Sequence, residues 1–322
     1  MNYTYRQSKQ EELPVIIDFI NYVFSHDHCP HDFMKLVPKV YGNNPKEHAV
    51  HFIAVNDNNQ IVGVVGLLPM NYHINNKVLK CGYIGSVSVH PYYRSEGHMK
   101  KLMALADEYL KTEEYDLGIL DGMRQRYEYY GYRKSGISVH YEVASDNVKH
   151  ALKNVDINDF NITEITDAED TMLDNIWNAF VCQPVFMGRS RDTLLYTLKN
   201  FENRIFAVTY KGEYTGYFTV TNNNSISEIN MNKKEDYYKS IKLWKQYCDF
   251  SEITIIAQPH QTDLLNVLDS FSEDRIIKNG ASFKIFNQDN TYLAIDEYKD
   301  FLPDGMAELF SIPLPVAVAD SF

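Results

Sequence analysis

The residues best suited to chemistry lie in the segment Arg94-Ser95-Glu96-Gly97-His98-Met99. An apolar run precedes this segment and a helical pattern follows it. Backbone N–H groups without intrahelical partners and the positive end of a helix dipole should therefore converge there. Gly97 would let the backbone approach an anion closely, and Arg94 would add a cation beside it. The segment is expected to bind a phosphate group.

Three elements must position this loop. The apolar residues Ile84 to Val89 predict a strand, and the apolar spacing from His98 to Lys111 predicts a helix with one buried face. The run Leu117 to Leu120 predicts a second strand. This strand should lie parallel beside the first, because the intervening helix has the length of a crossover connection.

The loop and its flanks resemble the acetyl-CoA site of GNAT-superfamily N-acetyltransferases. The motif of that site, Arg/Gln-x-x-Gly-x-Gly/Ala, is matched at Arg94 and Gly97, whereas Met99 replaces the usual small residue. Val89-His90-Pro91-Tyr92-Tyr93-Arg94 followed by Gly97-His98-Met99 is similar to the Eis-type (enhanced intracellular survival) branch. That branch consists of tandem GNAT enzymes. The resemblance covers residues 1–145 best.

The resemblance implies acetyl-CoA as the co-substrate. It places the diphosphate on the loop and the helix start, and the pantetheine arm on the backbone of Val87 and Val89, with Ser88 directed to the opposite face. The residues expected to bind CoA are Val87, Ser88, Val89, Arg94, Ser95, Glu96, Gly97, His98, Met99 and Lys100.

The segment Tyr127-Glu128-Tyr129-Tyr130-Gly131-Tyr132 matches a second motif of the family, Tyr-x-x-x-Gly-Phe/Tyr. A leaving CoA thiolate needs a proton donor, and a neutral phenol can supply the proton. By resemblance, Tyr127 is the expected general acid. The alternative is an aromatic core residue, since the chain has 24 tyrosines. The general base stays open among water, a side chain and the carboxylate of Phe322.

Composition and charge narrow the class of protein. The formal net charge of −12 argues against nucleic acid as a partner. No run approaches the roughly 18 apolar residues of a membrane helix, and the first residues do not read as a signal peptide. Four scattered cysteines suit reduced thiols. We expect a cytoplasmic protein without a membrane partner, and homo-oligomerisation stays open.

The segment Ser25 to Asp32 contains three His, one Cys and two Asp. A metal site is one interpretation of this composition. Zinc ligands lying so close together in sequence are unusual, however. A polar loop lining the acceptor side is the preferred interpretation, and no metal is expected.

An internal repeat indicates two related halves. Phe52 to Gly63 aligns with Ile205 to Gly216 at a constant offset and without a gap. We therefore expect an α/β (α+β) chain of tandem GNAT folds, each a mixed, mostly antiparallel sheet with a parallel central strand pair and flanking helices. The expected boundaries are 1–147 for the catalytic domain, 148–288 for a degenerate GNAT-like domain and 289–322 for an irregular C-terminal arm.

The phosphate loop does not recur in the second half. At the corresponding place, Asn230 to Tyr237 contains no glycine and carries two acidic residues. The second domain is therefore expected to have lost CoA binding. Arg189-Ser190-Arg191 is interpreted as a solvated helix start.

The expected function is transfer of acetyl from acetyl-CoA to a primary amine of a small molecule or peptide, by direct attack in a ternary complex. One alternative is a non-catalytic acyl-CoA-binding regulatory module. Another is a Fem-type aminoacyltransferase, which should engage tRNA and is disfavoured by the acidic charge balance.

Overall fold

The computed structural model describes residues 2–43, 45, 47–167, 169–303, 305–306, 312–317 and 320–322. The chain forms two compact units. The first comprises Met1–Lys134, Ala281–Ala294 and Ser321–Phe322, and the second comprises Ser135–Gly280 and Ile295–Asp320. These units differ from the expected linear boundaries at 147 and 288.

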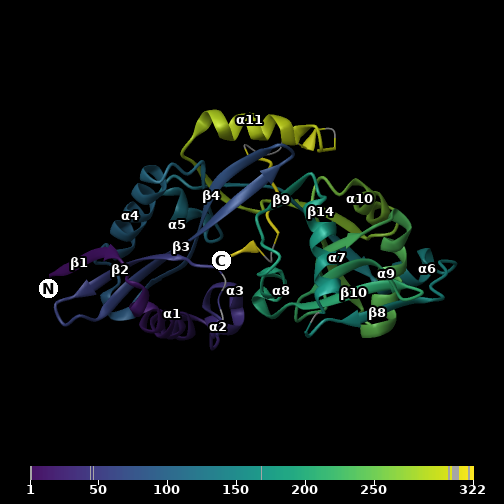
Figure 1. The fold of residues 1–322 in the computed structure, drawn as a ribbon, viewed down its shortest axis with the longest axis horizontal. Helices are drawn as coiled ribbons and strands as arrows, with labels where there is room; N and C mark the ends of the chain where they lie inside the picture. Colours follow the sequence, from purple (N-terminus) through teal and green to yellow (C-terminus); the bar gives the residue numbers. More distant parts are fainter. Residues whose placement is uncertain are drawn as a thin grey trace. The chain divides into compact units, whose positions relative to one another are not determined.

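The first unit is built on a mixed sheet in the order β1-β2-β3-β4-β5-β15-β6 (Figure 1). The pair β4 and β5 is parallel, whereas β1–β2, β2–β3, β3–β4 and β5–β15 are antiparallel. This is the parallel central pair that the sequence predicts. The strands are β1 (Tyr3–Gln7), β2 (Val50–Asn56), β3 (Ile61–Ile74), β4 (Lys77–Val89), β5 (Leu117–Leu120), β6 (Arg133–Ser135) and β15 (Ala281–Ile285).

Helices cover both faces of this sheet, with α4 on one face and α1 on the other (Figure 1). Phe52 and Ala54 of β2 share a core cluster with the apolar side of α4, as the alternation of side chains along a strand requires. The helical segments of this unit are η1 (Gln10–Glu12), α1 (Leu13–Asp27), α2 (Phe33–Leu36), α3 (Pro38–Tyr41), η2 (Pro91–Tyr93), α4 (His98–Thr112) and α5 (Arg124–Glu128).

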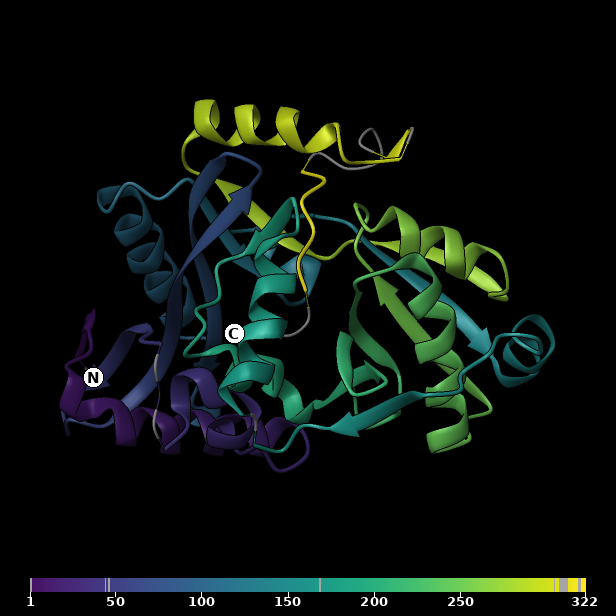
Figure 2. The same cartoon turned by 45° about the vertical axis from the view of Figure 1, so that its right-hand side comes forward.

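β3 and β4 form a long hairpin (Figure 2), and the pairing of its two strands is irregular at one point. Its register shifts between Val64 and Gly66, and Ser86 on the opposing strand has a φ of 53°. Such a bulge inserts an extra residue and bends the strand. Four glycines give the hairpin room on its two faces. Gly63 and Gly82 lie against α4, and Gly66 and Gly85 lie against Phe322.

The two parallel strands pair over only a part of their length. Their register runs from Cys81↔Leu117 to Ile84↔Leu120, where β5 ends while β4 continues to Val89. The sequence analysis expected β5 to pair with a later part of β4, Ile84 to Val89. The backbone of β4 beyond Ile84 therefore has no strand on its β5 side among the described residues.

The second unit repeats this architecture in a sheet of order β14-β7-β13-β12-β11-β10-β8, in which β12 and β13 are parallel. Its strands are β7 (Ser138–Ala144), β8 (Phe160–Glu164), β10 (Arg204–Tyr210), β11 (Glu213–Val220), β12 (Ile226–Met231), β13 (Glu252–Ala257) and β14 (Asp274–Lys278). The short strand β9 (Val185–Met187) also belongs to this unit.

The core of the second unit lies on both faces of its sheet, because successive side chains of β10 point to opposite faces. Phe206 and Val208 pack in a cluster with Trp244 of α9, whereas Ile205 and Ala207 pack in a cluster with α7 and α8. The helical segments are α6 (Ser145–Ala151), α7 (Asp170–Val181), α8 (Leu194–Leu198), η3 (Asn200–Glu202), α9 (Lys234–Cys248) and α10 (Thr262–Asp269).

Two strands explain why the units are not continuous in sequence. β7 follows the first repeat but pairs with β13 and β14 in the second sheet. β15 follows the second repeat but pairs with β5 in the first sheet. The expected irregular arm instead begins with a helix, α11 (Gln288–Lys299).

In the part of the chain that the structure describes, no helix is both long and apolar enough to cross a bilayer.

Candidate active site

A cavity of about 430 Å³ lies in the first unit where β4 ends and α4 begins. The end of α1 forms one wall, through Phe24 and Asp27, and Tyr130 contributes on the side of α5. The lining contains nine of the ten residues expected to bind CoA, and Glu96 is the one that it lacks. The nine are Val87, Ser88, Val89, Arg94, Ser95, Gly97, His98, Met99 and Lys100.

The loop before α4 is held by two residues in the left-handed region of the backbone. Ser95 has a φ of 67° and Gly97, the residue that begins the helix as its N-cap, has a φ of 83°. Because Gly97 has no side chain, the N-cap residue makes no side-chain hydrogen bond to the first turn of α4. A Cβ built on Gly97 meets no atom within 4 Å, so the space in front of the helix is open. Its first N–H groups are therefore available to an anion.

Three cationic side chains line the cavity, namely Arg94, Lys100 and Arg126. Arg94 is paired with Asp27, at 2.6 Å between Nη2 and Oδ2. The pKa of Asp27 is lowered by a hydrogen bond from His26 and then by Arg94. Both partners in the pair are more than one third exposed, so the pair contributes only about 0–1 kcal/mol. Arg94 can therefore exchange Asp27 for a phosphate at little cost.

The side chains of Glu96 and His98 are directed away from the cavity. The carboxylate of Glu96 accepts a hydrogen bond of 2.7 Å from the hydroxyl of Tyr3. The imidazole of His98 is buried, with its Nδ1 2.9 Å from the hydroxyl oxygen of Tyr5. Burial lowers the pKa of His98. His98 can therefore contact a ligand in the cavity only through its backbone. Glu96 does not belong to the cavity lining.

The segment Val87 to Val89 forms one wall of the cavity. Its β5 side is the unpaired edge of β4 described above. Edge backbone of this kind can pair with an extended amide-bearing chain. The hydroxyl of Ser88 donates to the carbonyl of Ser86, at 3.1 Å, and is buried. Ser88 thus stabilises the bulge.

Tyr127 lies on α5. It does not line the cavity, although its neighbours Arg126 and Tyr130 do. Its ring covers Gly122, where an added Cβ would lie 2.3 Å from the ring. The side chain is 7% exposed and belongs to the core cluster of the first unit. Burial raises the pKa of Tyr127, so the phenol keeps its proton at neutral pH.

Phe322 occupies a slot beside the bulge of β4. A Cβ on Gly85 would lie 2.1 Å from the main-chain oxygen of Phe322, and one on Gly66 would lie 2.9 Å from its ring. The ring stacks on Tyr41, whose hydroxyl lies 2.9 Å from Ser86 Oγ and 2.8 Å from His51 Nε2. The two glycines therefore make room for Phe322.

Two polar groups border this slot. The hydroxyl of Tyr83 donates to the carboxylate of Asp121, at 2.8 Å, and lies 3.1 Å from Ser321 Oγ. Asp121 follows β5 directly and is exposed. The sequence names Phe322 as one of three candidate bases, and it gives no sign of Gly66, Gly85 or Tyr41 as its surroundings.

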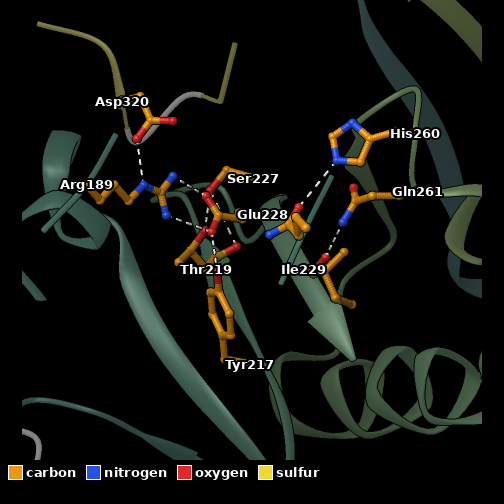
Figure 3. A network of polar contacts seen from close by, with 10 residues as sticks. Arg189, Tyr217, Thr219, Ser227, Glu228, Ile229, His260, Gln261 and Asp320 are labelled. Carbon is orange, nitrogen blue, oxygen red and sulfur yellow. Dashed lines mark hydrogen bonds and ion pairs between the residues drawn. The ribbon is translucent and has the colours of Figure 1, made fainter. Parts of the chain in front are cut away.

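The sequence suggested that Arg189 lies at a solvated helix start. In the second unit of the structure it does not. It is buried, with both carboxylate oxygens of Glu228 at 2.8 and 2.9 Å and Asp320 at 2.6 Å (Figure 3). Burial alone would raise the pKa of Glu228, but the charge of Arg189 and its hydrogen bonds outweigh burial and lower it. Arg189 is a structural residue of a buried charge network.

Among the described residues, no group of three or more His, Cys, Asp or Glu is arranged to hold a metal ion.

Comparisons with known proteins agree with this geometry. A family model for the acetyltransferase (GNAT) domain matches residues 4–138. A search of curated proteins by sequence finds no match.

Three solved structures share the fold. A probable N-acyltransferase from Enterococcus faecalis has a TM-score of 0.69 at 17% identity, over 90% of this chain and 74% of that one. Eis1 from Mycobacterium abscessus has a TM-score of 0.62 at 11% identity, over 91% and 76%. N-myristoyltransferase from Saccharomyces cerevisiae, solved with bound myristoyl-CoA, has a TM-score of 0.50 at 10% identity, over 88% and 82%.

The sheet with its short parallel pair, the open helix start at Gly97 and the match to the family model support the same assignment. The chain carries a GNAT acetyltransferase domain over residues 4–138 and is an enzyme of the acyltransferase class.

Proposed function

We propose that this protein is an acetyl-CoA-dependent N-acetyltransferase of the Eis type, which acetylates a primary amine of a small molecule or peptide within a ternary complex. The observation that carries the proposal is the open N-terminus of α4 at Gly97, surrounded by three cationic side chains. A diphosphate fits this place because backbone N–H groups, a helix dipole and side-chain cations act together on its charge.

Nearby groups suit the other parts of the same ligand. The unpaired edge of β4 at Val87 and Val89 offers backbone donors and acceptors to the amides of a pantetheine arm. Met99 and Tyr130 add apolar surface to the same cavity. Arg94 leaves a weak exposed pair with Asp27 when it binds a phosphate.

Bound acetyl-CoA supplies a thioester, whose carbonyl carbon an amine attacks and whose thiolate leaves. Tyr127 is proposed as the acid that protonates this sulfur. Its pKa is raised by burial, so the phenol holds a proton at neutral pH and can donate it.

An acceptor amine must lose a proton to become a nucleophile. The main-chain oxygen of Phe322 lies at the bulge of β4, and an α-carboxylate at that position would accept this proton. Asp121, beside Ser321, would attract the cationic form of the amine. Water and a side chain remain the other candidates for the base.

The experiment is a thiol-release assay with acetyl-CoA and a panel of amines, namely spermidine, an aminoglycoside, lysine and a short peptide. Loss of a general acid typically costs about 10²–10⁴-fold in rate, so Tyr127→Phe should lower kcat by that factor and leave acetyl-CoA binding intact. Tyr292→Phe is the matched control, because Tyr292 lies half exposed on α11.

Two results would count against the proposal. Equal kcat for the Tyr127→Phe and Tyr292→Phe variants would remove the phenol from the mechanism. Tight CoA binding without thiol release for any amine would favour a non-catalytic acyl-CoA-binding module, and a salt-dependent shift with RNA would favour the aminoacyltransferase alternative.

A further inference from the structure

We propose that the second unit binds an uncharged, polyhydroxylated small molecule, of which a pyranose sugar is the simplest form. The site is a cavity of about 550 Å³ formed within this unit by α7, the end of β12, the first turn of α9 and the start of α10. This volume lies within the range of roughly 300–1,000 Å³ that is usual for small-molecule sites.

The cavity occupies the place that corresponds to the CoA cavity of the first unit. In the first unit the lining comes from the end of α1, the end of β4 and the start of α4. In the second it comes from α7, the end of β12 and Tyr237 in the first turn of α9. The repeated fold therefore keeps a hollow at the same point of its sheet.

The charge of the two cavities differs completely. None of the described residues that line the second cavity is Lys or Arg, and Asp263 is its one carboxylate. The pKa of His260 is lowered to about 4 by burial, so this imidazole is neutral at pH 7. Phosphates and carboxylates would find no countercharge here, which disfavours CoA and other anions.

Side-chain amides dominate the lining instead. Six carboxamides reach it, those of Asn175, Asn178, Gln183, Asn230, Asn232 and Gln261. Each offers a donor and an acceptor, which matches the donor and acceptor of a sugar hydroxyl. Tyr237 and Tyr214 add aromatic surface, against which the C–H face of a sugar ring can pack.

Two of these amides serve the protein itself. Gln261 donates through Nε2 to the carbonyl of Ile229, at 2.9 Å (Figure 3). It accepts from the backbone N–H of Gln258, at 2.8 Å. Asn230 donates to the carbonyl of Ala179 at 3.1 Å. These bonds fix the walls of the cavity.

Other polar groups are left for a ligand. Asn175, Asn178 and Asn232 are exposed and form no side-chain hydrogen bond with the described part of the chain. The buried hydroxyl of Tyr214 likewise has no hydrogen-bond partner among the described residues. An unpaired buried hydroxyl is costly, and a bound hydroxyl compound would satisfy it.

His260 connects the cavity to the interior of the unit. Its Nε2 lies 3.4 Å from Gln183 Oε1 and its Nδ1 lies 3.4 Å from the hydroxyl oxygen of Tyr298. Because an amide oxygen can only accept, Nε2 carries the proton and Nδ1 accepts from the tyrosine. Both bonds are long, so a ligand oxygen can replace Gln183 as the acceptor of the Nε2 proton.

The test uses ligand-observed NMR and calorimetry on the full chain. The probes are D-glucose, N-acetyl-D-glucosamine and myo-inositol, with inorganic pyrophosphate and spermidine as charged counter-probes. We expect saturable binding of at least one neutral probe. Asn178→Leu should weaken this binding by about tenfold, the upper value for one hydrogen bond.

Asn161→Leu on β8 is the matched control, since Asn161 is exposed and outside the cavity. Asn232→Leu repeats the test at a second exposed amide, in case one variant misfolds. Acetyl-CoA affinity should be unchanged in all three variants. Failure of every neutral probe to bind, or a neutral probe bound equally well by the Asn178→Leu, Asn232→Leu and Asn161→Leu variants, would overturn the proposal.

Discussion

The open start of α4 gives a prediction that separates backbone strain from ligand binding. Gly97 and Gly212 have nearly the same backbone, with φ of 83° and 85°, and a Cβ on either would meet no atom within 4 Å. In both places alanine therefore costs conformational strain without a clash. Strain of about 1–2 kcal/mol, less the entropy that alanine removes from the unfolded chain, leaves about 1 kcal/mol of lost stability.

Only Gly97 faces the cavity, so only Gly97→Ala should affect CoA. A methyl group in front of the helix would displace the diphosphate from one or more N–H groups. A hydrogen bond to a charged group contributes about 1.5–3 kcal/mol, so the Kd for CoA should rise about 10- to 100-fold. Gly212→Ala, in the turn between β10 and β11, should leave it unchanged.

The assay is calorimetric titration of each variant with CoA, alongside chemical denaturation of the unliganded chain. The titration should separate the two variants, and the denaturation should show similar losses in the unit that carries each change. If the Gly97→Ala variant bound CoA as tightly as the Gly212→Ala variant, the diphosphate would not lie at the start of α4. The proposed function would then lose its main support.

Three further predictions concern other parts of the molecule. Gly85→Ala should expel Phe322 and lower kcat without changing the Kd for CoA, whereas Gly280→Ala, with no atom closer than 3.7 Å to its Cβ, should be neutral in both assays. The pKa of His51 is lowered to about 4 from 6.5 by burial. Unfolding should therefore become easier by roughly 3 kcal/mol as pH falls between these values, because the unfolded chain binds the proton first, and His51→Gln should flatten this dependence in pH-dependent denaturation. Arg189→Met should lower the free energy of unfolding by about 3–5 kcal/mol in denaturant titrations, since two buried carboxylates lose their cation; a loss below 1 kcal/mol would contradict a buried charge network.

Local patterns were sufficient to predict much of the first unit. The strand ending at Val89, the helix beginning at His98 and the strand from Leu117 all occur where the apolar spacing places them. The same holds for the second half, where α9 and β13 follow the expected pattern. These elements are predictable because each is encoded by periodicity within its own sequence.

Strand partners were less predictable. β7 follows the first repeat and β15 follows the second, but each pairs in the sheet of the other repeat. Nothing in an alternating apolar pattern specifies which sheet edge a strand will join, because the pattern encodes only which face is buried. The expected domain boundaries at 147 and 288 were linear because the sequence does not specify which sheet each strand joins.

Single side chains were predicted with mixed success for a similar reason. Gly97 has the positive φ that an approach to an anion suggests, because a turn of this kind requires glycine. The imidazole of His98 and the carboxylate of Glu96 instead bond to Tyr5 and Tyr3 of β1. Arg189 was taken for a surface residue because its partners, Glu228 and Asp320, are distant in sequence.

The connection between strand and helix explains how one fold produces two kinds of cavity. In the first unit, residues 90–97 separate β4 from α4, and this length allows the left-handed turn that opens the helix start. In the second unit, residues 232–233 alone separate β12 from α9. Asp236 in the first turn of α9 is buried and paired with Lys239, at 3.0 Å. An anion cannot replace it there, in keeping with the proposals of an uncharged ligand for the second cavity and of CoA for the first.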